Sequence, residues 1–172
     1  GENVFAIIKD ALYGGTAGSI NLSLIGCKEI PTKGLSNWDG KLDALKSIYL
    51  PDITRIGVEG LAYCVYLEEI NTPNVTSIHE NAFGGCTNLQ KITFGELTEV
   101  KGLSHDYDGI LDPGVDTERI NLVLSENQKV MTKKRQGNEY FWTPTKEYYK
   151  GSVEYCIPSF LEYKFNSVSF KK

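Results

Sequence analysis

The two histidines are the first residues to consider for acid–base chemistry, because imidazole exchanges protons near neutral pH. In the segment His105-Asp106-Tyr107-Asp108-Gly109 one of them precedes two carboxylates, and a hydrolase that uses His105 and Asp108 is one interpretation of it. No serine or cysteine of the 172-residue chain stands in a recognisable nucleophile motif, so we expect a protein without catalytic residues. His79 directly follows Ile78, at the end of a short alternating segment, and we expect it to be a solvated loop residue.

The acidic residues between Asp106 and Glu118 are spaced somewhat as in a calcium-binding loop. The match fails in detail, because Ile110 occupies the fifth position of such a loop and Gly109 falls two places early. The four cysteines form no CxxC pair and no Cys/His cluster, so no zinc site is indicated. We therefore expect an ordinary acidic turn, and neither a metal site nor a cofactor.

Composition and charge limit the possible partners. With 41% hydrophobic residues and a net charge of -4, the chain has the composition of a globular protein and lacks the basic character of a nucleic-acid-binding protein. No apolar run approaches the roughly 20 residues that cross a bilayer, so we expect no membrane insertion. The charge is unevenly distributed: residues 129–172 carry nine basic and four acidic side chains, whereas residues 1–128 carry nine basic and eighteen acidic ones.

A 22-residue repeat organises the middle of the chain. Shifting the sequence by 22 residues places Leu45 on Leu67 and Leu89, and it aligns a second apolar column made of Ile48, Ile70 and Ile92. Each unit begins with an apolar alternation typical of a half-buried strand and ends near a Pro or turn residue. A second short alternation follows, and then a segment that suits one helical or 3-10 turn closed by Gly.

One such unit cannot bury its own apolar column, so the units must stack. Stacking places strands about 4.8 Å apart, pairs them into a parallel sheet and joins the columns into one core. The sequence therefore predicts one coil of a solenoid for every 22 residues.

The units Leu45 to Cys64, Leu67 to Cys86 and Leu89 to Val100 resemble the BspA-type leucine-rich repeat, whose pattern is roughly LxxIxLPxxVTxIGxxAFxxC. The flanks are similar to capping regions in secreted repeat proteins of gut Bacteroidetes. The resemblance implies a β-dominated α/β fold: a right-handed leucine-rich-repeat solenoid with a parallel sheet, short helical or 3-10 turns on the convex side and a β-rich C-terminal cap. The resemblance also implies an extracellular or cell-surface protein. Such proteins are often lipid-anchored, and an outer-membrane lipoprotein is one form that this anchoring takes. The resemblance implies no catalytic residues.

Open solenoid ends expose apolar columns and strand edges, so both flanks are expected to cap the stack. We expect residues 1–41 to be an N-terminal cap with an irregular first coil at Ile20–Leu24, and residues 42–104 to be the repeats. Residues 105–172 then supply a final strand near Ile120–Leu124 and an aromatic cap, because ten of the 19 aromatic residues fall in the last 35 positions. Hairpin turns are predicted at Gly137-Asn138 and Lys150-Gly151.

Cys64 and Cys86 lie one coil apart, which places their Cα atoms about 5 Å apart and within reach of a disulfide. A buried, unbridged pair is the alternative, and we favour it because the family that the repeats resemble usually keeps this column as thiols.

The side chains between the apolar positions of the main strands must point away from the core, onto the open face of the sheet. They are Ser47, Tyr49, Glu69, Asn71, Lys91 and Thr93. Trp142 and Tyr148 are either part of the aromatic cap or a platform for a glycan or a protein. We expect a monomeric, non-catalytic binding module for adhesion to a host or bacterial surface protein or glycan, with a structural spacer as the alternative.

Overall fold

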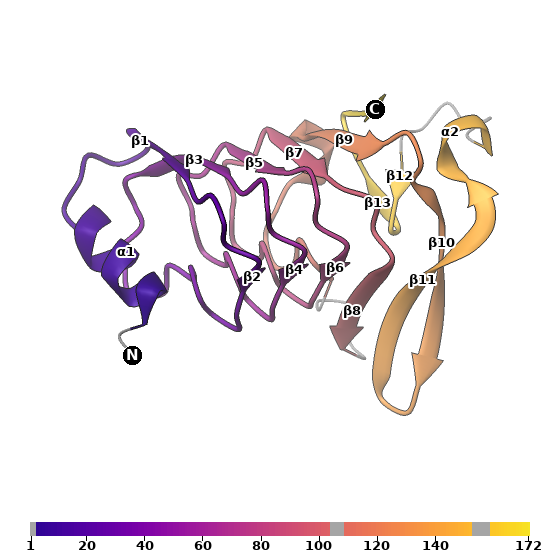
Figure 1. The fold of residues 1–172 in the computed structure, drawn as a ribbon, viewed down its shortest axis with the longest axis horizontal. Helices are drawn as coiled ribbons and strands as arrows, with labels where there is room; N and C mark the ends of the chain where they lie inside the picture. The colour runs from indigo at the N-terminus through magenta and orange to yellow at the C-terminus, as the bar shows by residue number, and fades with distance from the viewer. Residues whose placement is uncertain (1–2, 104–108, 153–158) are drawn as a thin grey trace.

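The computed structural model describes residues 3–103, 109–152 and 159–172. Figure 1 shows an elongated solenoid, with a helix at its N-terminal end and a long hairpin at its C-terminal end. The helix α1 (Val4–Leu12) begins at Asn3, whose side chain accepts a hydrogen bond from the N–H of Phe5, and it buries Phe5 in the core. The repeat coils lie between these two ends.

The main sheet contains one strand from each coil and is parallel throughout. Its strands, in spatial order, are β1 (Ile20–Ser23), β3 (Leu45–Tyr49), β5 (Glu69–Thr72), β7 (Lys91–Phe94), β9 (Asn121–Ser125) and β14 (Ser167–Lys171). Ile48, Ile70 and Ile92 are register partners, which confirms the 22-residue coil. The end strands β1 and β9 are also in register with their neighbours, through the pairs Leu22 with Ile48 and Ile92 with Leu122. The two residues of each pair are more than 22 positions apart in the sequence, so self-comparison at the 22-residue shift does not align these strands.

A second sheet forms the opposite side of the solenoid. Its order is β10 (Lys129–Gln136), β11 (Glu139–Tyr148), β8 (Glu99–Leu103), β6 (Ser77–Ile78), β4 (Arg55–Ile56) and β2 (Glu29–Ile30). The strands β2, β4, β6 and β8 are parallel, whereas the hairpin β10–β11 joins β8 in antiparallel orientation. The remaining elements are η1 (Thr117–Arg119), α2 (Tyr149–Ser152) and the small hairpin β12 (Ser159–Phe160) and β13 (Tyr163–Lys164).

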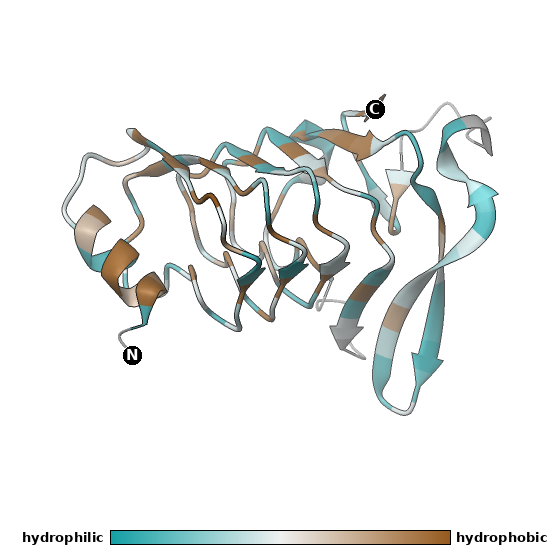
Figure 2. Ribbon diagram, in the orientation of Figure 1, coloured by the Kyte–Doolittle hydropathy of each residue, from teal (hydrophilic) through white to brown (hydrophobic). Residues whose placement is uncertain are grey.

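The core fills the space between the two sheets. No member of the columns that begin at Leu45 and Ile48 is more than 3% exposed. Figure 2 shows apolar residues along the coils, whereas the hairpin β10–β11 is mostly hydrophilic. Burial of the repeated columns therefore holds successive coils together.

The turns also connect the coils by hydrogen bonds. The N–H of Leu61 donates to the carbonyl of Ala82 (2.8 Å), and the N–H of Phe83 donates to the carbonyl of Ile110 (2.9 Å). Within one turn, the N–H of Gly84 donates to the carbonyl of Asn81, three residues earlier. The expected tight turns are therefore present as single hydrogen-bonded turns.

The C-terminal region confirms one predicted hairpin and corrects the other. Gly137-Asn138 connects β10 with β11, as expected. The hairpin turn expected at Lys150-Gly151 is wrong, because these residues lie in α2. A one-turn helix here redirects the chain after the long strand β11.

Cys64 and Cys86 are buried free thiols, which supports the unbridged alternative. The thiol of Cys64 donates to the carbonyl of Leu35, and that of Cys86 donates to the carbonyl of Leu61. The adjacent Cys86, and next burial, raise the pKa of the Cys64 thiol. Both side chains therefore serve as small core residues, and Cys64 stays protonated.

We expect the unfolded chain to react as a free thiol at Cys27, Cys64 and Cys86 without any reductant. Titration with a thiol reagent in denaturant measures this directly, and the same titration after reduction is the control. Fewer than three reactive thiols before reduction contradict the unbridged state.

The end of the chain is attached to the loop after the repeats through Tyr163. Its hydroxyl donates to Asp112 Oδ2 at 2.7 Å, and the N–H of Leu111 donates to the same hydroxyl at 3.4 Å. Gly109 makes room for the phenol, because a Cβ there would lie 1.7 Å from its oxygen. Burial, and next the hydrogen bond to Asp112, raise the pKa of Tyr163 far above its usual value.

Tyr163→Phe is expected to lower the free energy of unfolding by about 1–2 kcal/mol at neutral pH, because Asp112 loses its donor. Tyrosine with a raised pKa stabilises the fold below about pH 10, and that contribution is lost as the pH rises further, since only the unfolded phenol ionises there. Denaturant titrations should therefore show a shallower alkaline decline for the variant. The exposed Tyr148→Phe is the control, and equal stability of Tyr163→Phe and the native chain contradicts the contact.

Candidate binding surface

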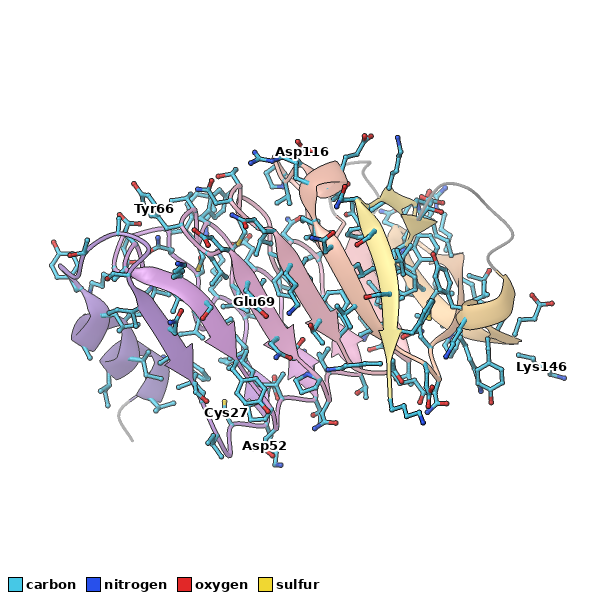
Figure 3. All side chains as sticks on the ribbon, turned by 90° about the horizontal axis from the view of Figure 1, so that it is seen from above. Cys27, Asp52, Tyr66, Glu69, Asp116 and Lys146 are labelled. Atoms are coloured by element: carbon cyan, nitrogen blue, oxygen red, sulfur yellow. The ribbon has the colours of Figure 1, made fainter. Side chains whose placement is uncertain are left out.

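The outward side chains of the main sheet form two rows across its six strands. The first row, in register, contains Asn21, Ser47, Glu69, Lys91, Asn121 and Ser167. The second row contains Ser23, Tyr49, Asn71, Thr93, Val123 and Ser169. We call these two rows the polar face, and Figure 3 shows Glu69 near its middle.

Neighbouring side chains of the first row are paired with one another. Ser47 Oγ donates to Asn21 Oδ1 at 2.7 Å, and Lys91 Nζ lies 3.2 Å from Glu69 Oε1. These side chains are half-buried or exposed, so the ion pair stabilises the fold by at most about 1 kcal/mol. Pairing nevertheless orients the side chains and neutralises the charge in the centre of the face.

The second row differs from the sequence expectation at one position. Tyr49 is 43% exposed and is the large aromatic residue of the two rows, but Thr93 is only 4% exposed. The expectation that Thr93 is accessible is wrong, because this short side chain lies between its register partners Asn71 and Val123 and is covered. Asn71 is half-buried, and within the described residues its Oδ1 atom is buried without a hydrogen-bond partner.

Trp142 and Tyr148 stand at different places along β11. Trp142 is half-buried, packs against the core and lines a hollow of about 500 Å³ with Met131 and Phe160. Tyr148 is 54% exposed, and Lys129 Nζ lies 5.9 Å from its ring centroid. The structure therefore does not bring these two rings together into one platform.

His79 has a different environment from the one expected. It is half-buried and, with Glu99, Lys101 and Tyr140, lines a groove of about 470 Å³ at the part of the second sheet where β11 joins β8. Burial, and next the positive charge of Arg55, lower the pKa of His79. The expectation of a solvated residue fails because the repeat pattern carries no information about the hairpin that packs beside it.

The alternative acid–base pair, His105 and Asp108, lies outside the described residues, as do Asp106 and Tyr107. In the described part of the chain no three His, Cys, Asp or Glu side chains are grouped as metal ligands. Among the same residues, no helix has the length and apolar character needed to cross a membrane.

Trp142→Ala is expected to lower the free energy of unfolding by about 2–4 kcal/mol, because its ring packs against the core. Tyr148→Ala is the control on the same strand, and its exposed ring predicts a change within about 0.5 kcal/mol. Chemical denaturation measures both. Native stability of Trp142→Ala would show that the ring is not a packing element.

Comparison with known proteins supports the repeat assignment. Residues 40–104 match a family model described as BspA type Leucine rich repeat region (6 copies). No significant match was found among curated proteins or among solved structures. The matched segment contains β3 to β8, whose strands pair at the 22-residue interval. Residues 40–104 are therefore a BspA-type leucine-rich repeat region.

Proposed function

We propose that the chain is a non-catalytic binding module and that a protein partner covers its polar face. The observation that carries this proposal is the pair of regular rows on the main sheet, in which Ser47, Tyr49, Glu69 and Lys91 are accessible. Their positions are set by the backbone register of a rigid parallel sheet.

Preorganisation favours binding through this face. Glu69 and Lys91 already contact each other, so a partner does not have to order two free side chains when it binds. Tyr49 contributes a large apolar ring with a polar hydroxyl, which is the combination common at the centre of protein interfaces. A continuous sheet face suits a protein partner, whereas small molecules usually bind in concave pockets.

We also propose that the protein is secreted or displayed at a cell surface and that binding serves adhesion. The BspA-type repeat region supports this proposal. The same proposal divides the chain into an N-terminal cap (1–41), the repeats (42–104) and a C-terminal region with the second cap (105–172). Phe5 at one end and Phe160 at the other are both buried against the core, as caps require.

Tyr49→Ala is expected to weaken binding to the protein partner at least about tenfold, the usual effect of removing a central interface aromatic. Surface plasmon resonance against a panel of purified extracellular-matrix proteins and bacterial surface proteins first finds the partner. The matched control is Tyr66→Ala, because Tyr66 is 41% exposed and lies in the turn that precedes β5, outside the two rows of the polar face.

Lys91→Ala tests the same face from a second coil, with the exposed Lys101 of the second sheet as its control. Unchanged affinity in both Tyr49→Ala and Lys91→Ala would exclude the polar face. Absence of binding to every protein of the panel would argue against the adhesion function.

A further inference from the structure

Trp38 is an exposed aromatic residue that the structure holds in a fixed orientation. The side chain is 61% exposed, although a tryptophan ring is normally covered. Its Nε1 atom donates to Glu59 Oε2 at 3.1 Å, and its ring centroid lies 3.8 Å from that of Tyr63. The indole thus keeps an accessible aromatic surface while its one polar atom is already used.

Tyr63 is itself fixed by the next coil. Its N–H donates to the carbonyl of Gly84 at 2.7 Å, and its ring lies so close to Gly85 that a Cβ there would be 2.6 Å from Tyr63 Cδ1. Gly85 also has a φ of 74°, which glycine adopts at little cost. Trp38, Tyr63 and Gly85 therefore form a rigid support that three successive coils provide.

Charges around the ring are balanced. Lys33 Nζ lies 3.6 Å from Glu59 Oε2, and Lys9 Nζ lies 3.1 Å from Asp39 Oδ1. Glu59, which accepts from the indole N–H, and Asp39, which follows Trp38 in the sequence, thus each have an ammonium partner. An aromatic site selects a cation when unpaired negative charge surrounds it, whereas the charges of Glu59 and Asp39 are each balanced by a lysine.

We infer that Trp38 and Tyr63 form a carbohydrate site that takes a neutral sugar ring of an oligosaccharide. The apolar C–H face of a pyranose carries a small positive charge and stacks on the electron-rich face of the indole. Lys33 and Glu59 stand beside the ring as a donor and an acceptor for sugar hydroxyls. Because the support is rigid, little conformational entropy is lost when the sugar binds.

This site is independent of the polar face. It uses residues of the turns between the two sheets, and it shares no side chain with the rows of the main sheet. Failure of one proposal therefore leaves the other intact. Variants of Tyr49 and variants of Trp38 separate the two experimentally.

Intrinsic fluorescence gives a direct test, because Trp38 and Trp142 are the two tryptophans of the chain. In a Trp142→Phe background, Trp38 is the single reporter. The probes are neutral hexasaccharides of α-linked glucose, β-linked glucose, mannose and N-acetylglucosamine, titrated to millimolar concentrations. We expect a saturable blue shift of the emission with at least one of them, since stacking removes water from the indole.

Isothermal calorimetry with that sugar then compares variants of the full chain. Trp38→Ala should weaken binding at least about tenfold, as expected when the central aromatic of a site is removed. Glu59→Leu releases the ring and removes the acceptor for sugar hydroxyls, so it should bind several-fold more weakly than the native chain. Glu59→Gln keeps an acceptor for the indole N–H but loses the carboxylate, so its affinity should fall between the two. Tyr66→Ala is the exposed-aromatic control and should have native affinity.

Melting curves establish that each variant is folded before its affinity is compared. No shift with any of the four hexasaccharides overturns the inference. Native affinity of Trp38→Ala also overturns it, as does a response to an oligo-arginine peptide alone, which would mark a cation site.

Discussion

The whole structure depends on the lateral contact between identical apolar positions of successive coils. Ile48, Ile70 and Ile92 lie in register, and each is buried only because its neighbours are present. This contact fixes the register in which the strands of successive coils pair, and the register decides which side chains point outward. The polar face is consequently a product of the core, since each outward residue of β3, β5 and β7 stands directly beside a buried isoleucine of the same strand.

The same contact explains how much the sequence could predict. Apolar residues recur every 22 positions because the same position of each coil is buried. The strands of the repeats, the stacked Cys64 and Cys86 and most of the outward residues can therefore be predicted from this period. The period carries no information about what packs beside a coil. The burial of Thr93, the groove around His79 and the helix at Lys150-Gly151 all depend on such neighbours, and they became visible only in the structure. Trp38 was missed for the same reason, because its partner Tyr63 comes from the next coil.

Side chains on the turns are freer to vary than those of the columns, and this difference separates the two proposed sites. The polar face is regular because its residues occupy equivalent positions in successive strands. The Trp38 site is irregular, since it combines a tryptophan from one turn, a tyrosine from the next and a glycine from the third. A repeat architecture can thus carry a local, single-copy site without any change in its core.

The position of β14 has a consequence for the order in which the chain folds during synthesis. This strand pairs with β9, although Asn121 and Ser167 are 46 positions apart. Strands β1, β3, β5, β7 and β9 can pair as they leave the ribosome, but the outer edge of β9 stays unpaired until β14 is made. An open edge of this kind recruits other extended chains, so β9 is exposed to such pairing until β14 covers it, and β14 is then the edge strand of the finished sheet.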